Sequence, residues 1–403
     1  MRILALLLLC AAGPASANGF FLYEHDARVT GRGGAATATD VEPSAIVYNP
    51  GGIAVIGGTS ISIGGSLVAP SATYYDPTYE QTHAESKLSV LPTAFITSKL
   101  GSVVAIGVGL HMPFGLAVAW PTSSPQAEIV TEQNLRTYFI SPVIGLDLDR
   151  AIPGLSVGGG VDLVPATVEL EQAVVFGSQR GTAALGGEAF GIGGRAGLMW
   201  RSSRVSIGAM WRSQVKLDFE GTGDFDIAEP YRAQLPPDGD IATTITLPMS
   251  VAVGLALRPS DRIELEVNAV WLDWSTFKQI AIDMPDGMQT VSPQNYEDTV
   301  TVRAGAELKL PEIRAAVRAG YIYDPTPVPA TTISARLPDV DRHDLTVGLS
   351  RKLGDSFDLH FGLLWVIPNS RRTSRELYMP LYKGAYTASA VVGAVSLDAR
   401  FGK

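Results

Sequence analysis

The most regular feature of the chain is an alternation of apolar and polar residues that begins at Thr59 and recurs to the C-terminus. In the stretch 205–220, apolar side chains fill most odd positions, and residues such as Ser206, Arg212 and Lys216 lie between them. A period of two places successive side chains on opposite faces, so it predicts β-strands with one apolar and one polar face. The residues before Thr59 are rich in small side chains and do not alternate.

The alternating stretches form a series of about fourteen runs. They cover residues 59–70, 89–100, 103–119, 135–148, 156–174, 188–201, 204–220, 243–258, 262–274, 298–310, 313–324, 343–353, 357–366 and 388–401. Many are about 10–16 residues long, whereas strands of soluble proteins usually have about 5–6 residues. Long connectors alternate with short turns, and aromatic residues gather near the run ends. An even number of long strands with these features is typical of outer-membrane barrels.

The pattern therefore predicts an all-β fold, a 14-stranded antiparallel transmembrane β-barrel built from residues 59–403. A soluble β-sandwich would also alternate with a period of two, and it stays open as an alternative. The strand length, the polar character of the inward face and the aromatic residues favour the barrel.

The first 17 residues have the features of a secretory signal peptide. Arg2 precedes an apolar run, and Ala15-Ser16-Ala17 supplies a cleavage site, so we expect mature residues to begin at Asn18. The apolar run is too short to cross about 30 Å of hydrocarbon. The only cysteine, Cys10, would leave with this leader. A lipoprotein signal at Cys10 is the alternative, and the later Ala-Ser-Ala argues against it.

Residues 18–58 are expected to form a hatch that plugs the lumen. A 14-stranded barrel is wider than the eight-stranded kind, whose side chains alone fill the interior. The sequence Asn49-Pro50-Gly51-Gly52 would end the hatch and turn the chain into the first wall strand. Proline fixes φ and glycine permits positive φ, which suits such a turn.

Several stretches resemble the FadL/TodX (OmpP1) family of outer-membrane transporters for hydrophobic compounds. They are Asn18-Gly19-Phe20, "GRGGAATATDVEPSAIVYNPGGIA" around Asn49-Pro50, "HMPFGLAVAW", "WLDWSTF" and "RAGYIYDPTPVPATTISARLPDVDRHDLTVG". The resemblance covers essentially all of residues 18–403. It implies a 14-stranded barrel, a plugging hatch and passive uptake of hydrophobic molecules, with long-chain fatty acids favoured. The chain departs from the family at Gly51, where alanine is usual, and in a short loop after the third run, which puts the outer docking site in doubt.

Pro113-Phe114-Gly115 interrupts the third run. Proline removes a ladder hydrogen bond and glycine offers no side chain, so a kink or bulge is expected. The functional interpretation is a gap in the wall through which an apolar molecule leaves sideways into the membrane. The alternative is a simple strand end near the barrel rim, and the family resemblance favours the kink.

A fatty acid needs a basic group for its carboxylate and an apolar pocket for its tail. Inward-facing Arg195, Arg303 and Arg318, with Lys309, are the candidates for the head group. Phe20, Phe21 and Leu22 of the hatch are the candidates for the tail. The gating residues are expected to be Asn18, Asn49, Pro50, Gly51, Pro113, Phe114 and Gly115. Each arginine could instead form a lumen salt bridge with Glu264, Glu266, Glu307 or Asp324.

Other classes of function find less support. The net charge of −9 argues against a nucleic-acid partner, and no cofactor or metal is implied. A calcium site at Asp339, Asp341 and Asp344 lacks the twelve-residue loop. A general porin remains an alternative, as does a lipid hydrolase in which His360 lies on one face with Asp358. We expect no enzyme, but a monomeric barrel in contact with outer-membrane lipids.

Overall fold

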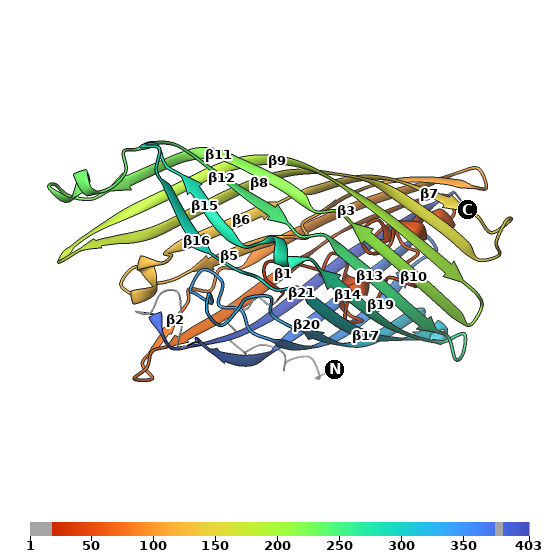
Figure 1. Cartoon of the computed structure of the whole chain (residues 1–403). Coiled ribbons are helices and arrows are strands. Elements are labelled where there is room, and N and C mark those ends of the chain that lie inside the picture. Colours follow the sequence, from red (N-terminus) through yellow and green to blue (C-terminus); the bar gives the residue numbers. More distant parts are fainter. Residues whose placement is uncertain (1–17, 375–381, 403) are drawn as a thin grey trace.

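The computed structural model describes residues 18–374 and 382–402, so the predicted signal peptide lies outside the described residues. Within these ranges the chain forms one antiparallel sheet that closes on itself (Figure 1). Strand β1 (Thr59–Tyr75) pairs with the last strand, β21 (Ala385–Phe401), along its whole length. This pairing closes the barrel and leaves no sheet edge that would expose unpaired backbone groups to lipid.

The wall has 14 strands, as predicted, and five of them are split into two segments. Between β1 and β21 they are β3 (Ser89–Leu100), β4 with β5 (Val104–His111, Gly115–Ala119), β6 with β7 (Glu132–Thr137, Phe139–Asp147), β8 (Leu155–Phe176), β9 (Gln179–Arg201), β10 with β11 (Val205–Arg212, Val215–Asp226), β12 with β13 (Gly239–Leu247, Ser250–Leu257), β14 with β15 (Ile263–Leu272, Gln279–Asp283), β17 (Thr299–Leu310), β18 (Ala315–Asp324), β19 (Arg342–Leu353) and β20 (Phe357–Arg372). Two short segments, β2 (Gln81–His83) and β16 (Gln289–Pro293), pair with β1 and β15 in the connecting loops. The loops and turns also carry the short 3-10 helices η2 (Pro125–Glu128), η3 (Tyr231–Gln234), η4 (Trp274–Thr276) and η5 (Pro311–Ile313).

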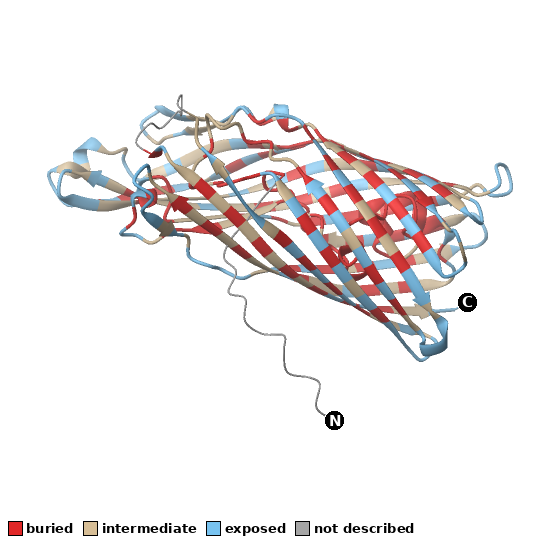
Figure 2. Cartoon of the chain, turned by 90° about the horizontal axis from the view of Figure 1, so that it is seen from below, coloured by how far each residue is buried: buried red, intermediate tan, exposed pale blue. Residues whose placement is uncertain are grey.

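The alternation observed in the sequence separates an outer face from an inner face. On β1, Ile63 and Leu67 are exposed, whereas Ser62 and Ser66 are buried. Figure 2 shows the same alternation of buried and exposed residues along the other strands. Apolar side chains that point outward, around an interior with polar side chains, match a wall that faces lipid. None of the helices in the described ranges is long and apolar enough to cross a bilayer.

Several strands are longer than the sequence pattern predicts. Strand β20 runs on to Arg372 and β21 starts at Ala385, although the pattern predicts a long connector over 368–387. Similarly, β9 starts at Gln179, where the predicted run starts at 188. These extensions continue the hydrogen-bonded ladder beyond the region in which one face is apolar, so alternation alone does not reveal them.

The two ends of the barrel differ. One end carries short turns such as 202–204 and 353–356, together with Phe401 of the last strand. The other end carries the longer loops, among them residues 325–341. In outer-membrane barrels the short turns lie in the periplasm and the long loops outside the cell, which fixes the orientation.

The N-terminal segment, residues 18–58, lies inside the barrel (Figure 1, red). It contains α1 (Ala27–Thr30), α2 (Ala45–Tyr48) and the 3-10 helix η1 (Pro50–Val55). Its middle is fixed by buried charge, because Arg32 lies 2.9 Å from Glu264 and 3.5 Å from Glu266, both on β14. Broken buried ion pairs are strongly destabilising, so this part of the segment is held firmly to the wall.

Wall glycines let the backbone of the N-terminal segment approach the strands closely. A Cβ atom at Gly208 of β10 would lie 2.0 Å from the carbonyl oxygen of Thr37. One at Gly362 of β20 would lie 2.5 Å from the carbonyl oxygen of Ala27. At these positions any larger residue would push the segment off the wall.

Candidate functional site

The first residues of the N-terminal segment reach up the lumen and are held there mainly by uncharged groups. The Asn18 side chain donates to the Thr301 hydroxyl at 2.9 Å and accepts from Thr299 and from the Trp274 indole at 2.9 and 3.0 Å. The backbone N–H of Gly19 donates to Asp339 at 3.1 Å. No arginine or lysine of the described residues forms an ion pair with residues 18–25, so this end is held less firmly than residues 28–42.

Asp339 belongs to the extracellular loop 325–341 and is fully buried against the N-terminal segment. Burial raises the pKa of its carboxyl group to about 8, and the hydrogen bonds from Thr326 and Gly19 oppose this shift. One carboxyl oxygen, Oδ1, has no hydrogen-bond partner. The contact that holds the N-terminal end is therefore sensitive to protonation near neutral pH.

The third wall strand is interrupted at residues 112–114, between β4 and β5. The N-terminal segment pairs with this interruption like a short strand. Leu22 N–H donates to the Pro113 carbonyl at 2.8 Å, Gly115 N–H donates to the Phe20 carbonyl at 3.0 Å, and Phe21 bridges to Phe114. The predicted hatch residues Phe20–Leu22 and the predicted kink residues Pro113–Gly115 thus lie in direct contact.

Aromatic packing reinforces this contact. The Phe20 ring lies 4.8 Å from the Trp274 ring and 5.5 Å from the Phe277 ring, both edge-on. The Phe21 ring lies 5.4 Å from that of Phe114. Each such pair stabilises the arrangement by about 0.5–1.5 kcal/mol beyond its buried area.

A gap in the wall adjoins the interruption. Strand β3 pairs with β4 only from Ala94 to Leu100, while β5 pairs with β6. The space between residues 89–93 and β5 is lined by apolar and polar groups, including Val90, Leu116 and Leu22. Its empty volume is about 1060 Å³, part of it open to solvent. Residues 89–93 and β5 are thus not joined by a strand ladder beside the predicted kink.

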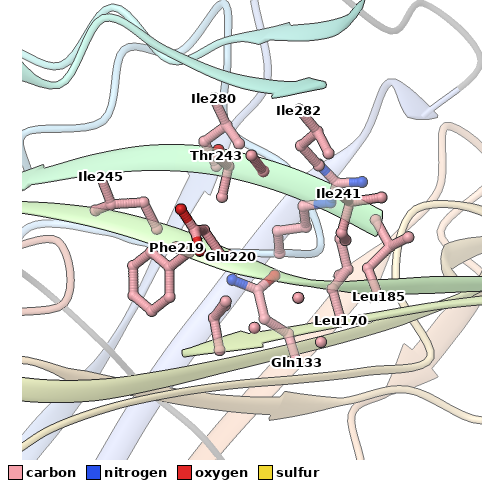
Figure 3. Close-up of a pocket in the computed structure, with 16 residues that line it drawn as sticks. Gln133, Leu170, Leu185, Phe219, Glu220, Ile241, Thr243, Ile245, Ile280 and Ile282 are labelled. Carbon is pink, nitrogen blue, oxygen red and sulfur yellow. The ribbon is translucent and has the colours of Figure 1, made fainter. Parts of the chain in front are cut away.

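A second cavity lies towards the extracellular end, among β8, β9, β11, β12 and β15 (Figure 3). Its labelled apolar residues are Leu170, Leu185, Phe219, Ile241, Ile245, Ile280 and Ile282, with Gln133 and Glu220 as polar neighbours. The empty volume is about 620 Å³, part of it open to solvent. The mainly apolar lining suits an apolar molecule.

An adjoining cavity connects this region with the N-terminal segment. It shares Ile245, Ile280 and Arg336 with the cavity of Figure 3 and extends to Phe20 and Phe277. Arg336 donates to the Ile129 carbonyl and to Gln172 at 3.2 and 2.9 Å. Among the described residues no carboxylate lies within 4.0 Å of its guanidinium. Arg336 is a cation that the sequence analysis missed, because it comes from a loop that folds back over the lumen.

The three predicted arginines occupy different environments. Arg195 lies 2.7 Å from Asp162, and Arg318 lies 2.7 Å from Glu307, so both are neutralised by wall carboxylates. Arg303 lies over the Tyr23 ring, 4.0 Å from its centre, beneath the N-terminal segment. The fourth candidate, Lys309, is exposed on β17. For Arg195 and Arg318, the salt bridge that the sequence left open as an alternative is the interaction present.

The predicted turn residues Asn49, Pro50 and Gly51 anchor the lower part of the segment. Asn49 donates to the Thr37 and Leu198 carbonyls at 2.7 and 2.9 Å and accepts from Gly51 N–H at 3.0 Å. Pro50 begins η1, where its missing N–H is not needed. Asn49 thereby joins the segment to strand β9.

His360 lies in a buried Ser–His–Asp arrangement. Its ring is 2.5 Å from the Ser350 hydroxyl and 3.3 Å from Asp398, whereas Asp358 lies 3.4 Å from Arg400. Arg318 also donates to Ser350, and the cavities described above do not reach these three residues. A serine hydroxyl that already accepts a hydrogen bond from a guanidinium does not match the nucleophile of a hydrolase site.

The three aspartates considered for calcium bind protein groups instead. Asp339 accepts from Gly19 and Thr326, and Asp341 accepts from Thr326 N–H at 3.0 Å. Asp344 lies 3.8 Å from the Arg342 guanidinium. Within the described ranges, no group of three His, Cys, Asp or Glu side chains is arranged to hold a metal ion.

Comparison with known proteins agrees with this architecture. Residues 8–401 match the sequence model of a family described as outer membrane protein transport protein (OMPP1/FadL/TodX). The chain is 22% identical over 412 residues to the long-chain fatty acid transport protein of Salmonella typhi. The matched region covers 93% of each of the two chains.

Two solved structures share the fold. A Pseudomonas aeruginosa FadL homologue superimposes with a TM-score of 0.83 at 17% identity, covering 95% of this chain and 100% of the homologue. The Ralstonia pickettii toluene transporter TbuX gives 0.75 at 19% identity, with 96% and 100% coverage. At these identities the likeness establishes the fold alone, a 14-stranded closed barrel.

The family match extends over nearly the whole sequence, including the motifs at Asn49-Pro50 and at 318–348. It places the protein in the outer membrane of a Gram-negative bacterium and identifies it as a transport protein for hydrophobic compounds rather than an enzyme. The chain therefore belongs to the OMPP1/FadL/TodX family of outer membrane transport proteins.

Proposed function

We propose that this protein is a passive channel for long-chain fatty acids, which enter the extracellular cavity and leave sideways through the wall gap beside β5. The observation that carries the proposal is the pairing of Phe20–Leu22 with Pro113–Gly115, since Phe20 lines the lumen cavity and Leu22 lines the gap. Release of the N-terminal end would join them. No energy source is needed, because an apolar molecule moves down its own gradient into the membrane.

The strength of the contacts supports a division of the N-terminal segment into two parts. Residues 28–58 are the fixed part of the hatch, held by Arg32 and by the Asn49 bonds to β9. Residues 18–25 are the moving part, held by neutral hydrogen bonds and aromatic packing. Segments that move in gating are drawn from the least stable contacts.

The substrate class has two candidates among the similar proteins, a long-chain fatty acid and the aromatic hydrocarbon toluene. The elongated series of cavities from Ile241 to Phe20 favours the longer molecule. The barrel closes within one chain through β1 and β21, which supports a monomeric channel surrounded by outer-membrane lipids.

A reversible cross-link tests the gate. Phe21 and Phe114 form a non-hydrogen-bonded antiparallel pair. In such a pair the Cα atoms are about 4.5 Å apart, which is within the range that a disulfide can bridge. The variant Phe21→Cys with Phe114→Cys should take up labelled oleate only after a reductant opens the disulfide. Each single variant, oxidised in the same way, serves as the control.

Two outcomes would contradict the proposal. Equal oleate uptake with the disulfide closed and open would exclude this route. Steady ion conductance of the unmodified protein in a planar bilayer, with no uptake of oleate, would favour the general porin. The cross-link also decides between these alternatives, because a porin blocked at this contact would lose conductance rather than lipid uptake.

A further inference from the structure

A small cavity lies directly behind the gate, on the lumen side of Phe21 and Pro113. Its lining includes Phe21, His25, Pro113, Arg212, Ser250 and Val270. It touches both the N-terminal end and the interrupted strand. Its chemistry is dominated by Arg212, the last residue of β10.

Arg212 is a buried cation without a partner. Its exposed fraction is 4%, and Nε and Nη2 have no hydrogen-bond acceptor. Within the part of the chain that the structure describes, no carboxylate lies within 4.0 Å of it. The guanidinium instead lies 4.8 Å from the centre of the Phe114 ring and 5.2 Å from that of Phe21. Aromatic faces attract a cation, but they do not satisfy its N–H groups.

The surroundings do not neutralise this charge. Arg195 lies opposite Arg212 in the strand register, so two guanidinium groups are neighbours. The nearby carboxylate, Asp162, accepts from Arg195 at 2.8 Å and from Ser141 at 2.6 Å through the same oxygen. His25 adds no charge, because burial lowers its pKa to about 3. Two cations thus face one carboxylate, which leaves a positive charge in excess at the gate.

We propose that Arg212 is the binding site for the carboxylate of an anionic amphiphile as it passes the gate. This inference rests on the proposed function and gives its substrate class a chemical basis. When Phe21 moves, Nε and Nη2 are free to bind the two carboxylate oxygens side by side, the geometry that arginine offers best. A neutral hydrocarbon has no group that could use these donors, so Arg212 makes the channel selective for fatty acids.

Selectivity between two substrates of equal length tests this site. Oleate and oleyl alcohol have the same tail and differ in the charge of the head group. In liposomes that contain the full-length protein, Arg212→Met should lower the initial rate of oleate transfer at least tenfold. Transfer of oleyl alcohol should stay within about twofold of the unmodified protein. Lys216→Met, which removes an exposed cation from the neighbouring segment β11, is the matched control and should change neither rate.

The outcomes separate this inference from the proposed function. If the unmodified protein transfers neither substrate, the proposed function fails. If it transfers both and Arg212→Met slows both equally, Arg212 only holds Phe21 and Phe114 in place, and the inference fails. Unchanged rates for both substrates would also overturn it. If Arg212→Met does not fold, Arg212→Lys is the second variant, because it keeps the charge but loses the paired donors. It should prefer oleate over oleyl alcohol less strongly than the unmodified protein does. An equal preference would count against the site.

Discussion

The hydrogen bonds of Asn18 provide the sharpest test of how the gate is held closed. Asn18→Ala removes three buried hydrogen bonds, to Thr301, Thr299 and Trp274, and leaves the Trp274 indole N–H without an acceptor. At about 0.5–1.5 kcal/mol for each bond, the closed position should lose about 3 kcal/mol. This corresponds to a shift on the order of a hundredfold towards the released state.

Hydrogen exchange followed by mass spectrometry measures this shift directly. The backbone N–H of Leu22 is bonded to Pro113 only while the gate is closed, so its exchange reports release. In Asn18→Ala, residues 18–26 should exchange on the order of a hundredfold faster, while residues 28–42, held by Arg32, keep their rate. The intact mass must show that the variant and the unmodified protein begin at the same residue, which the signal-peptide prediction expects to be residue 18. Asn369→Ala, at an exposed site on β20, is the matched control.

The reasoning is refuted if exchange in residues 18–26 does not change. It is also refuted if residues 28–42 accelerate by the same factor, because the segment would then move as one body. Faster exchange without faster oleate uptake would show that release of the segment does not control transport. The segment would then not be the gate of the lateral route.

Three further predictions follow from the contacts of the segment. Burial in the closed state raises the Asp339 pKa to about 8, and release of the segment restores its ordinary value. The closed state should therefore weaken as the pH rises from about 4 to about 8. Asp339→Asn should remove this pH dependence from the exchange of residues 18–26, and a pH dependence that persists would point to another group. Gly208→Ala should weaken docking of the segment by about 1–3 kcal/mol and produce ion leakage in planar bilayers, whereas Gly393→Ala, where a Cβ meets nothing within 4 Å, should not. Pro113→Val with Gly115→Val should continue the third strand and abolish oleate uptake while the barrel stays folded, and unchanged uptake would argue against the lateral route.

The barrel wall could be predicted from the sequence because lipid imposes one simple requirement on every strand. Outward positions such as Ile63 must be apolar, and the alternation follows directly. The strand ends were harder to predict, since β20 and β9 continue where neither face is constrained by lipid. The interruption near Pro113 could be predicted because proline lacks the N–H that the strand ladder needs and glycine weakens a strand interior.

The candidate site was only partly predictable. The sequence places Arg195 and Arg212 on the same inward face but does not show that Asp162, distant in the chain, neutralises the first and leaves the second unpaired. Arg336 could not be found by alternation, because a loop carries it into the lumen. Burial and charge balance depend on which strands become neighbours, and that information appears only with the closed barrel.

The close fit between the N-terminal segment and the wall glycines has a consequence for assembly. Thr37 lies against β10 and Ala27 against β20, so the segment makes close backbone contact with two strands that are far apart in the sequence. Arg400, near the end of the closing strand β21, also binds Glu42 of the segment at 2.6 Å. We therefore expect the segment to be in place before β1 and β21 join. Closure of the barrel would then be the last folding step, and it would enclose the N-terminal segment.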